Sequence, residues 1–189
     1  MCWYCNPEKF KLQRTKNDIT VYKVLRCEIV PRNEPYELTS WYYPSFVYSL
    51  GKIRYSDITI SEMPNNLSGD MNSGNCIIVT KGLHSYIDLP KLSYKCLIVD
   101  LYVYSYSGWN VPVAVECIIP AGSDYAINEY GEVISSQIIP IKIIPYNKLV
   151  LAETYCDNVI KDCGDINEKF HKAYEDIYKQ LNNYYGKNK

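Results

Sequence analysis

The stretch VPVAVECIIPAGSDYAINEYGEVISSQIIPIKII, residues 111–144, carries the strongest pattern in the chain. Apolar residues alternate with their neighbours from Val111 to Cys117, which is the period-two pattern of a half-buried strand. Pro120 to Gly122 interrupts it, because proline cannot donate to a ladder and glycine adopts unusual backbone angles. A short segment at 125–127, a turn, and a β-branched run at 133–144 broken by a proline follow. We expect these strands at the centre of a β-sheet.

Further strands are predicted on the N-terminal side of this stretch. Ile19 to Val30 is apolar and alternating, and residues 76–80 form a short strand-like run. Residues 97–106 also alternate, and Gly108 to Asn110 would turn them back into the central stretch as an antiparallel hairpin. Residues 61–75 are rich in Asn, Asp and Gly, which is typical of a loop.

The period becomes helical after Pro145. Apolar residues recur every three or four positions from Leu149 to Cys163, and Asp165 with Glu168 resembles a capping box that starts a second helix. We therefore predict an α+β fold with an antiparallel-rich sheet and a C-terminal two-helix hairpin. The expected division is an N-terminal extension at 1–17, a β-rich core domain at 18–146 and the helical hairpin at 147–189.

Composition favours a globular chain and argues against several function classes. The 189 residues are 47% hydrophobic and carry a net charge of −1 with no basic stripe, so nucleic-acid binding is not indicated. The N-terminus lacks the pattern of a signal peptide, and no apolar stretch approaches the ~20 residues that span a membrane. We expect a cytoplasmic protein that does not bind membranes.

The eight cysteines are interpreted as thiols of a reducing compartment. Those in strand-like runs are assigned to the core: Cys27, Cys76, Cys96 and Cys117. Cys2 and Cys5 form a CxxC motif, which is half of a zinc site. A composite site with Cys156 and Cys163 stays open, although the spacing fits no standard pattern. The preferred interpretation is an N-terminal hook without metal, and no cofactor is predicted.

Catalytic motifs are not found. The chain has no phosphate-binding glycine loop, no GxSxG and no HExxH. His84 is one of two histidines, and no partner for it is identifiable from spacing. We therefore predict a protein that is not an enzyme.

Tyrosine is the unusual residue, with 20 copies against 3 of phenylalanine. Tyrosine suits surfaces that are half apolar and half wet, and it is enriched in recognition sites. The alternative is that these tyrosines simply fill the place of phenylalanine in the core. We predict binding to another protein, with the oligomeric state left open, through these candidate contact residues: Trp41, Tyr42, Tyr43, Tyr48, Tyr102, Tyr104 and Tyr106.

Several short motifs together resemble an uncharacterised family of small bacterial and phage proteins. They are the VYKV at 21–24, the GLHSY at 82–86, the CIIPAGS at 117–123 and the GE at 131–132. The resemblance covers roughly residues 1–144 and supplies no assigned activity. Small phage accessory proteins often inhibit host defence systems, as anti-CRISPR proteins do. The resemblance thus implies a phage-encoded inhibitor acting in the host cytoplasm.

A second resemblance gives the alternative function. The turn at 119–123 followed by Glu132 is similar to the late region of ADP-ribosyltransferases, in which an acidic residue polarises the nicotinamide ribose. Tyr22 and Lys23 stand where that family carries Tyr-Arg or His, so the arginine is replaced. This resemblance implies an ADP-ribosyltransferase-like or nucleotide-binding site at Tyr22, His84 and Glu132.

Overall fold

The computed structural model describes residues 3–5, 10–28, 38–40, 43, 45–62, 77–89, 110–153 and 164–186. The strands before the central stretch are β1 (Trp3–Cys5), β2 (Gln13–Arg14), β3 (Ile19–Glu28), β4 (Leu38–Thr39), β5 (Val47–Tyr48), β6 (Arg54–Tyr55), β7 (Thr59–Glu62), β8 (Ile77–Lys81) and β9 (Leu83–Tyr86). The central stretch and the C-terminal region supply β10 (Asn110–Ile119), β11 (Asp124–Ile127), β12 (Glu132–Ser135), β13 (Gln137–Ile143), α2 (Tyr146–Glu153) and α4 (Gly164–Gly186).

Strand β10 is the spine of a ten-stranded sheet. It pairs antiparallel with β3 along its whole length, from Asn110 opposite Glu28 to Ile119 opposite Ile19. Its other edge pairs with β13, where the register shifts between Glu116 and Cys117. The strand order is β2-β11-β12-β9-β3-β10-β13-β6, and a second sheet has the order β1-β8-β7. The prediction of a strand-rich antiparallel fold with a helical C-terminal region is confirmed.

Five strands close into a ring, which we call the ring. β4 pairs with the second half of β3, and β5 pairs with β4. In the turn that follows β5, the Gly51 N–H donates to the Pro140 carbonyl of β13 over 2.7 Å. Because β13 pairs with β10 and β10 with β3, the path returns to its start. The residues at its core are fully buried: Val21, Leu25, Leu38, Val113, Val115 and Ile138.

The other part of the sheet, which we call the open arm, consists of β9, β12, β11 and β2. It joins β3 through the pair Tyr22 and Tyr86 and ends at β2. A small core of Val79, Ala126 and Ile134 connects it to the three-stranded sheet. Gly82 joins β8 to β9 with a φ of 140°, and a Cβ there would lie 2.4 Å from the Ile134 side chain. Only glycine fits this junction without strain.

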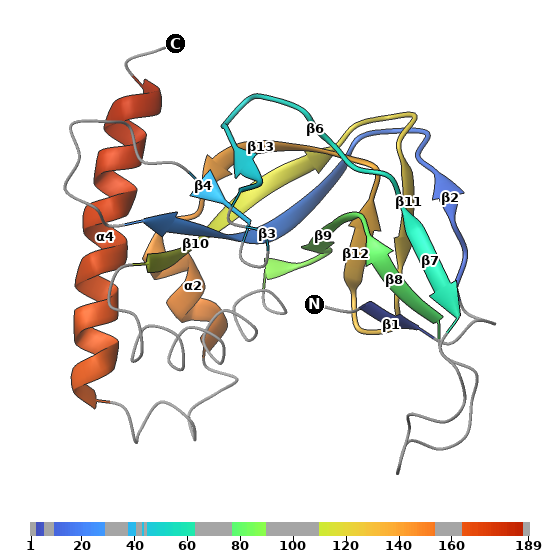
Figure 1. The fold of residues 1–189 in the computed structure, drawn as a ribbon. Coiled ribbons are helices and arrows are strands. Elements are labelled where there is room, and N and C mark those ends of the chain that lie inside the picture. Colours follow the sequence, from blue (N-terminus) through green and yellow to red (C-terminus); the bar gives the residue numbers. More distant parts are fainter. Residues whose placement is uncertain are drawn as a thin grey trace.

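Helix α4 is joined to the ring by a tyrosine. The Tyr174 side chain is 1% exposed; its hydroxyl accepts from the Ala114 N–H at 3.1 Å and donates to the Ile144 carbonyl at 2.7 Å. The Tyr146 ring of α2 stacks on His171 of α4 at 4.3 Å. Figure 1 shows α4 at one end of the molecule and β1, β7 and β8 towards the other.

The sequence-based strands hold with local corrections. The strand predicted at 19–30 is β3, and the run predicted at 133–144 is two strands separated by Ser136. The expectation of a half-buried strand at 111–117 is wrong for its first part, since residues 111–115 are all buried. Both faces of β10 are covered there. The predicted strand at 97–106, the segment joining the two helices and most of the loop at 61–75 lie outside the described residues.

The predicted N-terminal extension contributes a strand to each sheet. β1 pairs with β8, and β2 pairs with β11. Thr15 is buried; its N–H donates to the Ser123 carbonyl, and its hydroxyl donates to Pro120. This segment therefore belongs to the body of the fold.

Candidate functional site

The predicted contact aromatics separate into three groups. Five of them lie outside the described residues: Trp41, Tyr42, Tyr102, Tyr104 and Tyr106. Tyr43 is 65% exposed, as a contact residue should be. Tyr48 is 2% exposed, and the expectation that it forms part of the surface is wrong. It stands opposite Leu38, which stands opposite Cys27, so all three side chains point into the ring.

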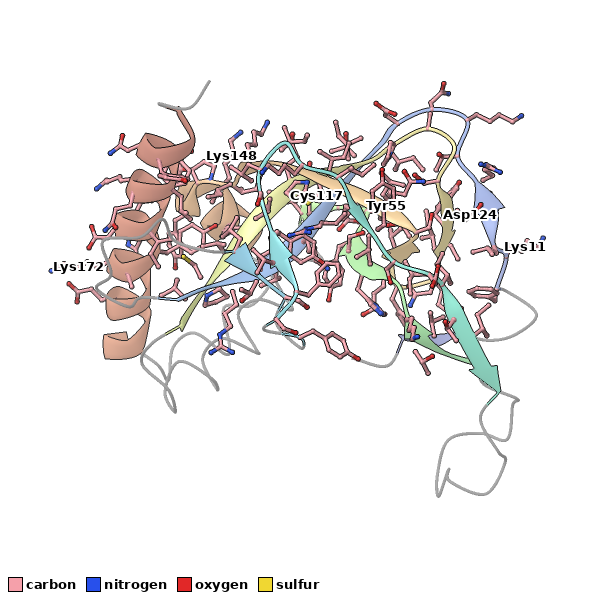
Figure 2. The ribbon with its side chains drawn as sticks, turned by 45° about the horizontal axis from the view of Figure 1, so that its top comes forward. Lys11, Tyr55, Cys117, Asp124, Lys148 and Lys172 are labelled. Atoms are coloured by element: carbon pink, nitrogen blue, oxygen red, sulfur yellow. The ribbon has the colours of Figure 1, made fainter. Side chains whose placement is uncertain are left out.

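A second exposed tyrosine, Tyr55, directly follows an arginine that contacts the turn of Tyr43. The Phe46 N–H donates to the Tyr43 carbonyl over 2.8 Å, which closes the turn between β4 and β5. The Arg54 guanidinium lies 5.6 Å from the Phe46 ring centroid, and the next residue, Tyr55, is 63% exposed. Tyr55 is labelled on β6 in Figure 2. We call Tyr43, Phe46, Arg54 and Tyr55 the β6 surface.

The β6 surface adjoins the end of the sheet. β6 ends the path of eight successively paired strands in the ten-stranded sheet, so no other described strand continues the ladder beyond it. The Phe46 ring packs on the Tyr48 ring with centroids 5.2 Å apart, which fixes the surface to the interior of the ring. Tyr55 was not singled out from the sequence. Its sole signal is a tyrosine beside a cation in a short strand, which is weak.

The alternative site residues come together on the sheet. Tyr22 stands opposite Tyr86, and Tyr86 stands opposite Glu132, so the three side chains share one face of β3, β9 and β12. His84 precedes Tyr86 by two residues and points to the same face. The segments predicted from three distant parts of the sequence are therefore neighbours, with Tyr86 between them.

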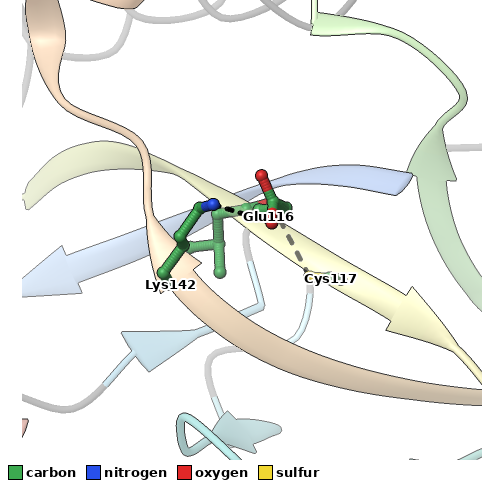
Figure 3. A network of polar contacts seen from close by, with 4 residues as sticks. Glu116, Cys117 and Lys142 are labelled. Atoms are coloured by element: carbon green, nitrogen blue, oxygen red, sulfur yellow. Dashed lines mark hydrogen bonds and ion pairs between the residues drawn. The ribbon is translucent and has the colours of Figure 1, made fainter. Parts of the chain in front are cut away.

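The four side chains on this face, which we call the polar row, are partly or fully buried. The Glu132 carboxylate accepts from the Asn128 side-chain amide at 2.9 Å. Burial, together with the Lys23 charge, lowers the pKa of His84 from 6.5 to about 3, so its imidazole is neutral at pH 7. A neutral imidazole can donate and accept hydrogen bonds. The row continues on β10, where Glu116 forms an ion pair with Lys142 of β13 at 3.0 Å (Figure 3).

The other face of β3 carries a buried lysine inside the ring. Lys23 is 8% exposed; its Nζ donates to the His84 carbonyl and lies 5.4 Å from the Tyr48 ring centroid. Burial lowers the pKa of Lys23 from 10.5 to about 8. Burial also raises the pKa of Cys117 to about 12, so this thiol keeps its proton. Cys117 lies in the middle of the molecule in Figure 2.

Sequence reasoning did not identify Lys23 as an internal residue. The signal was present, because Lys23 shares its strand face with Ile19, Val21 and Leu25. A charged residue in an apolar series is a candidate buried charge. The assignment of cysteines to the core is confirmed for Cys27 and Cys117, which are both buried, whereas Cys76 and Cys96 lie outside the described residues.

Neither a metal-ligand cluster nor a helix able to cross a membrane is present in the part of the chain that the structure describes. It brings together no group of three or more histidine, cysteine or acidic side chains suited to a metal ion. Cys2, Cys156 and Cys163 of the open zinc alternative lie outside that part. None of its helices combines the length and the apolar character needed to cross a membrane.

Comparison of the chain with models of known protein families, with curated proteins and with solved structures finds no match.

Proposed function

We propose that this protein acts by binding another protein, and that the β6 surface is the contact. The observation that carries the proposal is the pair of exposed tyrosines, Tyr43 at 65% and Tyr55 at 63%, beside the last strand of the sheet. Tyrosine is enriched among the residues that dominate interface energies. An edge strand also offers backbone N–H and C=O groups to an added strand of a partner.

The β6 surface is held in place before a partner arrives. Phe46 packs on the buried Tyr48, Arg54 stacks over Phe46, and the turn hydrogen bond fixes Tyr43. A rigid surface loses less conformational entropy on binding than a mobile one. This arrangement favours recognition by preformed side chains.

The resemblance to phage proteins in residues 1–144 directs the search for the partner. A phage-encoded inhibitor would bind a component of a host defence system, so purified defence complexes are the first proteins to test.

The test combines a mapped contact with matched variants. Hydrogen exchange of the complex should show protection at residues 43–55, and Tyr43→Ala with Tyr55→Ala should weaken binding by about 10–100-fold or more. Tyr130→Ala is the control, because Tyr130 is also 65% exposed but lies on the turn between β11 and β12. Equal affinity of the double variant and the wild type would overturn this assignment.

A second candidate function rests on the convergence of Tyr22, His84 and Glu132 on one sheet face. It is a nucleotide-binding site of ADP-ribosyltransferase type. A calorimetric titration with NAD should show binding to the wild type that Glu132→Gln abolishes. Glu129→Gln should preserve this binding, since Glu129 lies on the exposed turn. Heat signals identical for both variants would exclude this site.

A further inference from the structure

The ammonium group of Lys23 lies inside the ring, and no carboxylate of the described residues forms an ion pair with it. Its neighbours on the same strand face, Val21 and Leu25, are fully buried. Among the described residues, no acidic side chain forms an ion pair with it. Its polar contact is the His84 carbonyl, which accepts from one ammonium hydrogen and leaves the others for further acceptors. A buried cation without a partner is costly, so such charges are normally paired.

Ser85 is a second buried donor close to Lys23. It is 1% exposed, and its hydroxyl has no hydrogen-bond partner among the residues that the structure describes. Tyr22 and Tyr86 share one sheet face, so Lys23 and Ser85, each one residue away, both point to the opposite face. The carbonyl that accepts from Lys23 also belongs to the peptide that joins His84 to Ser85. The two unfilled donors therefore lie beside each other.

The nearby titratable groups do not supply the negative charge. The Cys117 pKa is raised to about 12, and burial likewise raises the pKa of the Tyr48 hydroxyl, so both are neutral at pH 7. His84 is neutral as well. The cluster thus has hydrogen-bond donors and positive charge in excess. Buried unsatisfied groups of this kind in native proteins are explained by water or by an ion.

We propose that Lys23 and Ser85 form an internal binding site for a small monovalent anion of the chloride class. The ammonium and the hydroxyl donate to the anion, and the Tyr48 ring centroid lies 5.4 Å from the ammonium. Water would satisfy the hydrogen bonds but not the charge, whereas an anion satisfies both. The site lies inside the ring and is separate from the β6 surface.

The direct test is diffraction from crystals grown in sodium bromide. An anomalous peak within hydrogen-bonding distance of Lys23 Nζ and Ser85 Oγ is expected. Bromide found at surface positions alone, with none beside Lys23, would overturn the proposal.

The test in solution is thermal unfolding in sodium chloride against sodium gluconate at equal ionic strength. Once chloride exceeds its Kd, each tenfold rise should raise the folding constant about tenfold. Ser85→Ala should weaken this dependence and Lys23→Met should remove it, whereas Lys142→Met, at an exposed lysine, should preserve it. A chloride dependence that is unchanged in Lys23→Met would contradict the site. So would a thiolate absorbance that disappears in Cys117→Ser, because Cys117 would then be the counter-charge.

Discussion

The ring and the open arm are built from one sheet but are stabilised differently. In the ring, backbone pairing returns to its starting strand, and the interior is filled by residues of 0% exposure such as Leu25 and Val113. The open arm adds Leu83, Tyr86 and Val133 to this large core, while its Ala126 and Ile134 form a second, smaller core with Val79 of β8. The arm also ends in β2, next to Leu12, which is 49% exposed.

Because of this difference, the two regions should contribute unequally to the stability of the protein. Burial of apolar area is the main source of stability, so the ring should dominate the free energy of unfolding. The arm adds fewer side chains to the large core and depends also on the smaller core and on the junction at Gly82. Four substitutions, at His84, Leu25, Gly82 and Tyr174, would test this view.

Lowering the pH should destabilise the folded protein through His84, which lies at the junction of the ring and the arm. Its pKa in the folded state, about 3, lies below the unfolded value of 6.5, so its contribution is present above pH 6.5 and is lost as the pH falls towards 3. The resulting loss in the free energy of unfolding is at most roughly 5 kcal/mol. Denaturant titrations at several pH values should show a shallower acid dependence for His84→Gln than for the wild type.

Truncation of the ring core should be nearly as severe. Leu25→Ala removes a fully buried side chain and should lower the free energy of unfolding by about 2–5 kcal/mol. Leu12→Ala, at a half-exposed residue beside β2, is the control and should alter it by less than about 0.5 kcal/mol. Similar losses from the two variants in urea denaturation would show that burial of Leu25 in the ring contributes little to stability.

Gly82, at the junction between the two sheets, should not tolerate substitution by a residue with a side chain. Gly82→Ala should cost about 1–3 kcal/mol in backbone strain, and the Ile134 side chain must also move. Gly122→Ala is the control for a positive φ without crowding, because nothing lies within 4 Å of its Cβ position. Calorimetry should rank Gly82→Ala as the less stable. The opposite ranking would argue against close packing at the junction.

The contact of α4 with the ring should depend on one hydroxyl. Tyr174→Phe leaves the Ala114 N–H and the Ile144 carbonyl without this partner, which should cost about 1–3 kcal/mol. Tyr130→Phe, at an exposed tyrosine, should be neutral within about 0.5 kcal/mol. Thermal unfolding of both variants is the measurement; equal stability would mean that water replaces the hydroxyl.

Local patterns predicted the elements better than their partners. Alternation located β3 and β10, and the change of period after Pro145 located the helical region. The pairing of β10 with β3 joins segments about 90 residues apart in the sequence, and no local signal specifies it. The same limit applied to the site, because exposure of Tyr55 and burial of Tyr48 depend on which strands lie beside them.

The closed ring has a consequence for the order in which the chain folds. Its defining contacts join β3 to β10 and Gly51 to Pro140, so a long loop must close before any of them is gained. The hairpin of β11 and β12 joins residues that are close in the sequence. Folding rates fall as contacts become less local, so the hairpin should form early and the ring late. The region that contributes most to stability would then be the last to assemble, and a slow refolding phase should report on ring closure.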